Sequence, residues 1–222
     1  MIGVTDAVDR IDALTLRDAA RDFARFPSPW LIGGAVALAL VARVAVGGWR
    51  STELLIPAAI LLAEPFTEWI IHVYLLHFRP RTVRGRRLDP FVARKHRMHH
   101  ADPRDLPLVF VPVRVVVPSL VIGAAISFAV APDIRRALTA IVAADTMFFA
   151  YEWTHYLIHS TYRPRTRLYR GIWRAHRLHH YRNERYWFGV TMHGADRMLR
   201  TYPGKDAVPV SATARTLGVD TV

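Results

Sequence analysis

Residues 68–82 read EWIIHVYLLHFRPRT, and residues 152–166 read EWTHYLIHSTYRPRT. Both stretches carry E-W, then a pair of histidines, then R-P-R-T, and they begin 84 residues apart. Each leads through an arginine-rich segment to a second histidine motif, HRMHH at 96–100 and HRLHH at 176–180. A chance likeness between two arginine-rich, aromatic segments would not preserve this order. The sequence therefore indicates an internal duplication, in which each unit is a helical hairpin followed by a histidine-bearing arm.

The apolar residues, 52% of the chain, are concentrated in stretches long enough to cross a bilayer, which takes about 20 mostly apolar residues. There are four of them: residues 30–47, 53–77, 107–131 and 137–159. Buried helices of a soluble bundle are the alternative, but such helices seldom stay apolar on all faces over this length. The predicted fold is all-α and integral to the membrane. It has four transmembrane helices arranged as two hairpins, with a cytoplasmic helical cap that carries the histidines.

The basic residues are distributed unevenly along the chain. There are 30 Lys+Arg against 18 Asp+Glu, and the net charge of +12 by itself fits a nucleic acid or an anionic membrane surface as partner. The three long segments outside the spans contain 25 of these basic residues, and the two short connections contain 3. The positive-inside rule then places both termini and the histidine motifs on the cytoplasmic side. The topology accounts for the charge, and no nucleic-acid recognition motif is found, so no nucleic-acid partner is expected.

The length of 222 residues leaves no room for a second large fold. Residues 1–29 lack the basic start and apolar core of a cleaved signal peptide, and residues 11–26 have a pattern compatible with an amphipathic surface helix. We expect residues 30–203 to form the membrane domain and residues 204–222 to form a flexible C-terminal tail.

Ten of the eleven histidines fall in four clusters at metal-ligand spacing, and the chain has no cysteine. The clusters are His72 and His77; His96, His99 and His100; His155 and His159; and His176, His179 and His180. The absence of cysteine excludes iron–sulfur clusters, thiolate zinc sites and thiol catalysis. Imidazole suits Fe, Zn, Cu and Ni, and ten ligands exceed what one metal accepts, so two metals are expected.

The spacing within each cluster has a geometric meaning. Residues three and four apart share a face of an α-helix, so His155 and His159 point the same way. Each triplet can converge on one metal or straddle two. His72 and His77 diverge by about 140° on an α-helix, so they fit a helix end better than a helix middle.

Several polar residues lie close to these clusters in the sequence. A metal-bound histidine usually gives its other N–H to a carboxylate or a carbonyl. Glu68 precedes His72 by four residues and Glu152 precedes His155 by three, so both are candidates for that role, with Glu64 and Asp145 weaker ones. The competing interpretation is an ion pair with an arginine of the arms. Three further residues are candidates to support the second triplet: Asn183, Glu184 and Asp196. We expect His193 to be a structural or supporting residue rather than an eleventh ligand.

The order H-x4-H, H-x2-H-H, H-x3-H, H-x2-H-H across four spans resembles the fatty acid hydroxylase / sterol desaturase superfamily of integral-membrane di-iron enzymes. The likeness covers about residues 55–203, and YRNERYWFGVT at 181–191 also resembles bacterial members. The resemblance implies that the ten clustered histidines bind two iron ions, for which zinc can substitute, with O2 as co-substrate. It implies an oxidoreductase of lipid biosynthesis that acts on a lipid C–H bond through the metal site, with no separate catalytic residue.

Within the superfamily, H-x3-H at 155–159 favours the fatty acid hydroxylases, because short bacterial carotenoid hydroxylases tend to have H-x4-H at this place. A sterol or carotenoid hydroxylase and a desaturase stay open as alternatives. A membrane metal-binding or transport protein is more remote, because it would place ionisable residues along a mid-span pathway. The lipid, the oxidised carbon and the oligomeric state are not determined by the sequence.

The expected partners are a membrane lipid as substrate and a separate electron donor of the ferredoxin or cytochrome type. Some fatty acid hydroxylases carry a cytochrome b5 domain at the N-terminus, but 29 residues are too few for one. A basic cytoplasmic face would steer an acidic donor toward the site.

Overall fold

The computed structural model describes residues 14–219, and this part of the chain is mostly helical. Three of its helical segments are long and apolar enough to cross a membrane: Pro27–Val46, Ser51–Leu76 and Leu106–Val130. The first is helix α2. The second joins the 3-10 turn η2 (Ser51–Leu54), α3 (Leu55–Ile70) and the π-helix η3 (Ile71–Leu76). The third joins α5 (Leu106–Val109) and α6 (Val113–Val130).

The outer surfaces of these segments carry large apolar side chains. Leu38 on α2 is 73% exposed, Leu62 on α3 is 74% exposed and Val121 on α6 is 63% exposed. In water such side chains would form an extended apolar patch of a size that soluble monomers rarely show. The apolar surface and the segment lengths together indicate a membrane protein, as the sequence predicts.

Helix α7 (Ile134–His159) is the fourth long helix, and it packs against α2, α3 and α6. It begins at Asp133, whose side chain accepts a hydrogen bond from the backbone N–H of Arg136. Unlike the other three, α7 does not reach the hydropathy of a membrane span, so three described segments meet that criterion where the sequence predicts four. The reason is its content of ionisable residues, including the buried Asp145 and Glu152.

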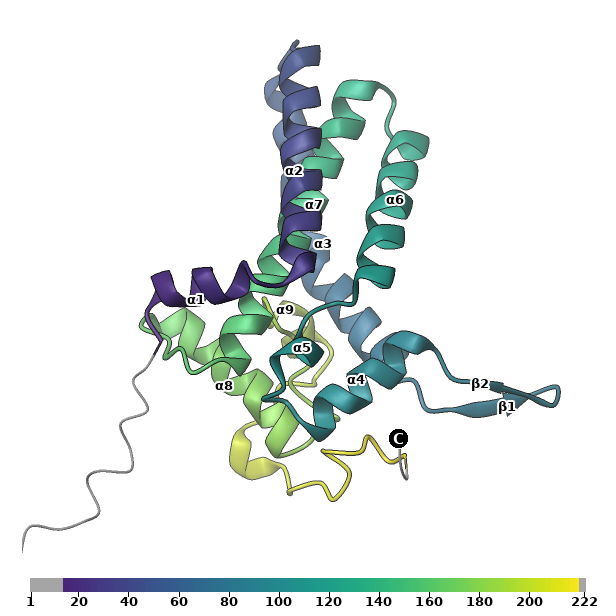
Figure 1. The fold of residues 1–222 in the computed structure, drawn as a ribbon, viewed down its shortest axis with the longest axis vertical. Helices are drawn as coiled ribbons and strands as arrows, with labels where there is room; N and C mark the ends of the chain where they lie inside the picture. The colour runs from purple at the N-terminus through teal and green to yellow at the C-terminus, as the bar shows by residue number, and fades with distance from the viewer. Residues whose placement is uncertain (1–13, 220–222) are drawn as a thin grey trace, which may run out of the picture.

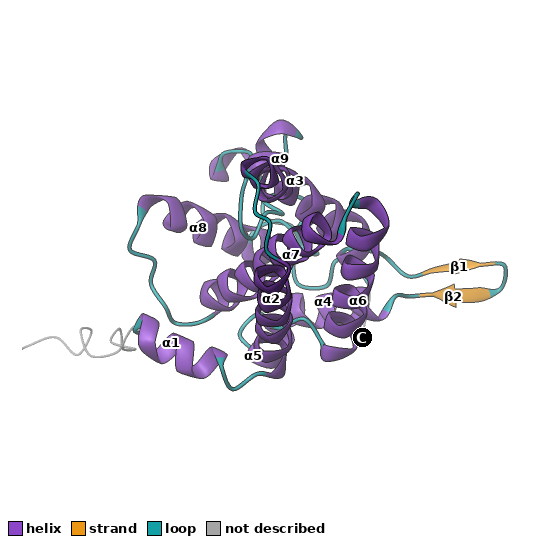
Figure 2. Cartoon of the chain, turned by 90° about the horizontal axis from the view of Figure 1, so that it is seen from above, coloured by secondary structure: helices purple, strands orange, loops and turns teal. Residues whose placement is uncertain are grey.

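The histidine-bearing helices α4 (Phe91–Ala101) and α8 (Arg167–Tyr181) lie beyond one end of the long helices (Figure 1). Helix α1 (Leu16–Phe23) crosses the same end, and the short helix α9 (Gly194–Met198) packs against α3 (Figure 2). The 3-10 turn η4 (Lys205–Ala207) follows in the C-terminal segment. Seen from above, α7 lies near the centre of the molecule, with the other helices around it (Figure 2). The ends of the long helices and the shorter helices therefore meet in one layer.

The segment 81–88 departs from the predicted all-α fold. β1 (Arg81–Val83) pairs with β2 (Arg86–Leu88) in an antiparallel hairpin that projects from the body of the protein (Figure 1). The turn consists of Arg84 and Gly85, both with positive φ, which is the turn geometry that matches the twist of a two-residue hairpin. In the second half, R-P-R-T leads instead directly into α8, and Thr166 caps that helix.

The segments at the two ends of the described chain both contribute buried side chains. α1 is amphipathic as predicted, with Ala19 and Phe23 buried against a core that includes Tyr156 of α7, whereas residues 1–13 of the N-terminal segment lie outside the described residues. The sequence predicts a flexible tail after residue 203; within residues 204–219, three side chains are buried, namely Val208, Ala214 and Leu217. Val208, 3% exposed, packs against Ala175 of α8 and Trp187, and Leu217, also 3% exposed, lines a small cavity beside His77.

Candidate metal centre

All ten clustered histidines converge in the layer beyond the long helices, and they divide into two groups of five. The first histidine group is His72, His77, His96, His100 and His179; the second histidine group is His99, His155, His159, His176 and His180. Within each group, one nitrogen from every imidazole lies within 4.8 Å of the others. Nine of the ten side chains are buried and His77 is half-buried, so the nitrogens are shielded from bulk water.

The two triplets straddle the two groups instead of converging on one. On α4, His96 and His100 are one turn apart and enter the first group, whereas His99 points into the second. On α8, the middle histidine, His179, likewise enters the first group, and its two neighbours enter the second. Each half of the duplicated chain therefore supplies a pair and two triplet histidines to its own group, and exchanges its middle histidine with the other half.

The pair His72 and His77 is brought together by the π-helix η3, in which hydrogen bonds close across five residues. The backbone N–H of His77 donates to the carbonyl of His72 at 3.0 Å. This wider turn places residues five apart on the same face of the helix. H-x4-H in the π-helix therefore directs two imidazoles into one group, as H-x3-H does in the α-helix α7. The sequence prediction of a helix end was close, since His77 follows directly after the last residue of η3.

In four of the ten histidines, Nδ1 faces away from the group and forms a hydrogen bond with a backbone carbonyl, and this bond determines the tautomer of the ring. A backbone carbonyl only accepts, so each Nδ1 bonded to one must carry the proton and leave Nε2 as a bare lone pair. The four Nδ1 donors and their carbonyl acceptors are His72 to Phe188 (2.7 Å), His100 to Ala214 (2.8 Å), His179 to Tyr186 (2.7 Å) and His155 to Val109 (2.9 Å). These four imidazoles therefore all present lone pairs to the interior of their groups.

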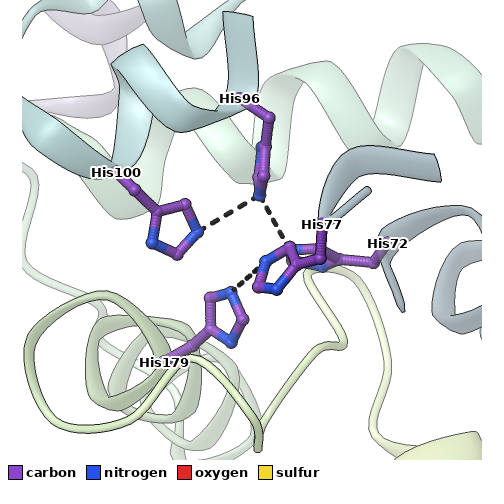
Figure 3. A group of neighbouring side chains, drawn as sticks. All are labelled: His72, His77, His96, His100 and His179. Atoms are coloured by element: carbon purple, nitrogen blue, oxygen red, sulfur yellow. Dashed lines mark hydrogen bonds between the residues drawn. The ribbon is translucent and has the colours of Figure 1, made fainter. Parts of the chain in front are cut away.

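Lone pairs facing one another need a cation between them. In the first group, Nε2 of His96 lies 3.1 Å from Nε2 of His72 and 3.2 Å from Nε2 of His100, and a single proton on His96 satisfies only one of these contacts (Figure 3). In the second group, Nε2 of His155 and both nitrogens of His99 are buried without a hydrogen-bond partner. Such orphaned nitrogens are costly unless a metal binds them.

The spacing of the nitrogens fits a metal as well. At a metal–nitrogen distance of about 2.1 Å, ligands at right angles lie about 3.0 Å apart and opposite ligands about 4.2 Å apart. The nitrogen–nitrogen contacts of 3.0–3.2 Å inside the groups match the first value, and the 4.8 Å limit accommodates the second. Each histidine group can therefore hold one metal ion.

The site favours neutral imidazoles, which are the form that binds a metal. Burial, together with the neighbouring imidazoles, lowers the pKa well below 6.5 for the following residues: His96, His99, His176, His179 and His180. Burial also lowers the pKa of His100 to about 3.

These shifts predict an acid-sensitive metal-free protein. Below pH 6.5 the unfolded chain binds protons that the folded protein excludes, so stability is complete above that pH and falls as the pH drops toward the folded pKa values. The slope is up to about 1.4 kcal/mol per pH unit for each such histidine. Thermal unfolding of the metal-free protein in detergent between about pH 8 and pH 5 measures this directly. A Tm that stays constant over that range would contradict the prediction.

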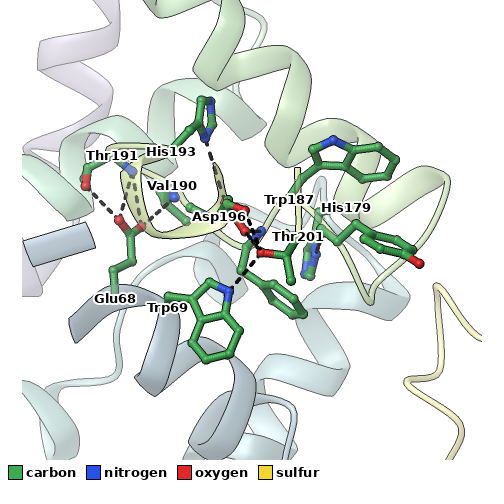
Figure 4. A network of polar contacts seen from close by, with 12 residues as sticks. Glu68, Trp69, His179, Trp187, Val190, Thr191, His193, Asp196 and Thr201 are labelled. Carbon is green, nitrogen blue, oxygen red and sulfur yellow. Dashed lines mark hydrogen bonds and ion pairs between the residues drawn. The ribbon is translucent and has the colours of Figure 1, made fainter. Parts of the chain in front are cut away.

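Among residues 14–219, Glu68 and Glu152 form no hydrogen bond with a ligand histidine and no ion pair with an arginine. Instead each holds the loop that supplies a carbonyl acceptor. Glu68 accepts from the backbone N–H groups of Val190 (2.6 Å) and Thr191 (3.1 Å) and from the Thr191 hydroxyl (2.7 Å) (Figure 4). The same loop carries Phe188, whose carbonyl accepts from His72. Glu68 thus positions His72 through the loop.

The second half repeats this arrangement. Glu152 accepts from the backbone N–H of Val111 at 3.0 Å, and Val109, two residues earlier, provides the carbonyl for His155. In both halves the glutamate precedes the first histidine of the pair, and the backbone it holds follows the histidine triplet of the other half: residues 190–191 for Glu68 and residue 111 for Glu152. Glu64 and Asp145, the weaker candidates, make no side-chain hydrogen bond within the described range.

Asp196 holds the loop after the second triplet from its other side. Its carboxylate accepts from the backbone N–H groups of Phe188 (3.1 Å) and Gly189 (2.7 Å) and from the Thr201 hydroxyl (2.6 Å). Gly189 is required there, because a Cβ at that position would collide with the carbonyl of Met192. Burial raises the pKa of Asp196, while these donors oppose the shift.

The remaining sequence candidates lie further from the metal-binding nitrogens. His193 lies 4.0 Å from Asp196 and packs on Tyr202, and it joins neither histidine group. Asn183 and Glu184 hold the C-terminal segment: Asn183 donates to the Pro209 carbonyl at 3.2 Å, and Glu184 accepts from the Thr213 hydroxyl at 2.6 Å.

Sequence reasoning missed the four carbonyl acceptors, and no signal in the side chains marks them, because every residue has a carbonyl. Ala214 is the most distant from a motif, since it lies in the segment expected to be a tail. The segment therefore completes the first histidine group.

Truncation after Ala207 is expected to weaken metal binding by the first group about 10–100-fold, as loss of a partner to a ligand histidine does. The second group should keep its metal, because none of its described hydrogen bonds involves residues 208–219. Metal titration of the purified variant measures this, with truncation after Val219 as the matched control. Full occupancy of both groups in the shorter variant would contradict a role for the segment.

Comparison with known proteins agrees with this picture. The model of the fatty acid hydroxylase family matches residues 57–201. The chain is similar to the solved structure of full-length scs7p, in which only the hydroxylase domain is visible, with a TM-score of 0.67 and 21% sequence identity. The match covers 82% of this chain and 69% of that chain, and at this identity it shows a shared fold. No curated protein matches the chain.

Proposed function

The chain belongs to the fatty acid hydroxylase family, and on that basis we propose that it is an O2-dependent di-iron hydroxylase of a lipid C–H bond. The family makes it an oxidoreductase, which agrees with the resemblance noted in the sequence. The observation that carries the proposal is the pair of histidine groups, each with five convergent imidazole nitrogens. Iron is the metal we assign to both groups, because the family is iron-dependent and neutral imidazole suits iron.

When bound, the two iron ions would supply the redox chemistry that activates O2. The ten histidines would hold these ions, and the four backbone carbonyls would keep the outward N–H of their histidines in a fixed direction. Burial of the imidazoles keeps water away from the site. Hydroxylation places one oxygen atom in the C–H bond and releases the other as water, which consumes two electrons and two protons.

Two electrons per turnover require a reductant. We assign this role to a separate ferredoxin or cytochrome. The arginine-rich surface around the histidine layer supports an acidic donor, because opposite charge accelerates such encounters.

The membrane arrangement is part of the same proposal. α7 would cross the bilayer as the fourth span, shielded by α2, α3 and α6, which pack on it. Both termini and the histidine layer would lie on the cytoplasmic side, because the basic residues are concentrated in the segments at that end. An acyl chain would then reach the site from the bilayer, with its polar head at the interface.

The test is metal content combined with turnover. Protein purified without oxygen should contain about two iron ions per chain. With reductant, O2 and membrane lipid extract, mass spectrometry should show a lipid that has gained one oxygen atom. A loss of two hydrogens would identify a desaturase instead, and metal binding without any lipid product would favour a metal-binding or transport protein.

A further inference from the structure

A cavity of about 1110 Å³ lies between α1, the end of α7 and α8, and one of its walls is His159 of the second histidine group. Five arginines line it: Arg104, Arg163, Arg170, Arg174 and Arg177. We call this space the arginine cavity. Its volume is slightly above the roughly 300–1,000 Å³ of typical small-molecule binding sites and far exceeds that of a free phosphate ion.

The charges in the arginine cavity are almost all of one sign. None of the five guanidinium groups forms an ion pair with the residues described between Leu14 and Val219. Arg177 lies over the rings of Trp173 (4.6 Å) and Tyr181 (5.4 Å). The one carboxylate in the wall, Asp22, already accepts from the Tyr156 hydroxyl at 2.8 Å and from Arg25 at 3.4 Å. Clustered arginines without acidic partners suit a phosphate or carboxylate, which they bind through paired hydrogen bonds.

Part of the wall is apolar, although Ser160, Thr161 and Tyr162 also line it. Leu14, Leu106 and Trp173 line the cavity beside the arginines. Asp22 of α1 and Leu14, two residues before that helix, also line the cavity, and α1 crosses the end of the long helices (Figure 1). A ligand with an anionic head and an apolar chain matches the arginines and the apolar residues of this wall.

Among the residues described, the equivalent position beside the first histidine pair has a smaller cavity. The cavity beside His77 has a volume of about 150 Å³, and Leu217 of the C-terminal segment is one of the residues that line it. Its wall includes the carboxylate of Glu184 as well as Arg79 and Arg185. The large basic cavity therefore lies beside the second histidine pair, and the cavity beside the first pair is much smaller.

We infer that the arginine cavity binds the anionic head, a phosphate or a carboxylate, of the lipid that the second histidine group oxidises. The assignment of this lipid as substrate rests on the proposed hydroxylase function. The binding of an anionic amphiphile does not, since it follows from the arginines and the apolar wall.

Binding is tested on the full chain in nanodiscs of phosphatidylcholine, without added metal. The probes are palmitate, lysophosphatidic acid, the neutral monopalmitoylglycerol and inorganic phosphate. Arg170→Gln/Arg174→Gln removes two charges from the cavity. Arg84→Gln/Arg86→Gln removes two from the exposed hairpin as the matched control.

We expect palmitate or lysophosphatidic acid to bind at least about tenfold more weakly to the cavity variant and equally well to the hairpin variant. Monopalmitoylglycerol should bind weakly to all three proteins. Equal weakening in the hairpin variant, or equal affinity for the neutral probe, would overturn the inference. Inorganic phosphate bound as tightly as lysophosphatidic acid would overturn the lipid assignment and leave a site for a free anion.

Turnover separates this inference from the proposed function. If the iron-loaded protein oxidises no lipid while the binding pattern holds, the hydroxylase function fails and the binding site stands. If it hydroxylates a neutral lipid as fast as an anionic one, and the cavity variant does so at the parental rate, the inference fails and the hydroxylase function stands.

Discussion

His99→Ala is expected to lower the iron content from about two ions per chain to about one and to reduce lipid hydroxylation at least about 100-fold. His99 is the histidine that α4 contributes to the second group, and both of its nitrogens are buried without a hydrogen-bond partner. Loss of an outer partner to a ligand already costs about 10–100-fold, so loss of a ligand should cost more. Metal analysis and product quantification on the same preparation measure both effects.

His179→Ala is the matched variant in the other half, and it should empty the first group while the second keeps its metal. His193→Ala is the control, because His193 is outside both groups. If His99→Ala retained two iron ions, the assignment of His99 as a metal ligand of the second histidine group would be contradicted. Circular dichroism and thermal unfolding show whether a variant has lost its fold rather than a ligand.

Glu68→Gln is expected to destabilise the folded protein by about 1–3 kcal/mol and to weaken metal binding by the first group about 10-fold or more. Both carboxylate oxygens of Glu68 accept hydrogen bonds from Val190 and Thr191, and an amide replaces one of these acceptors with a donor. The loop that loses its attachment carries the Phe188 carbonyl, which holds the Nδ1–H of His72. Thermal unfolding gives the stability change, and iron titration gives the affinity.

Glu64→Gln is the control, since Glu64 lies one turn earlier on α3 and is half-buried. Thr191→Ala removes only the hydroxyl donor and should have a smaller effect in the same direction. A Glu68→Gln protein with parental iron affinity would show that the loop stays in place without the carboxylate.

Much of the site follows from local features of the sequence. The histidine spacings identified the ten residues that the structure gathers, and they did so because ligand type and helical periodicity are properties of short stretches. The resemblance to fatty acid hydroxylases was confirmed by the family match over residues 57–201. The apolar stretches indicated membrane helices for the same local reason, although only three meet the criterion within residues 14–219.

Other features had a weak local signal or none. The sequence analysis did not predict the hairpin 81–88. Its strands are short and rich in arginine, and Arg84-Gly85 is their one local turn signal. The role of the C-terminal segment was missed because its contribution is the carbonyl of Ala214, which does not depend on the side chain. The glutamates were singled out correctly as buried polar groups, but their partners are loop N–H groups and not imidazoles.

The sequence by itself determined which residues have the chemistry of metal ligands and which segments prefer lipid, because side-chain type and local period decide both. Only the tertiary structure decided how the ten histidines divide into two groups, with His99 and His179 each reaching the group of the opposite half. The same is true of the carbonyls that orient the imidazoles and of the large arginine cavity beside His159. These depend on how distant segments pack, and the duplicated motifs are too alike to reveal that packing.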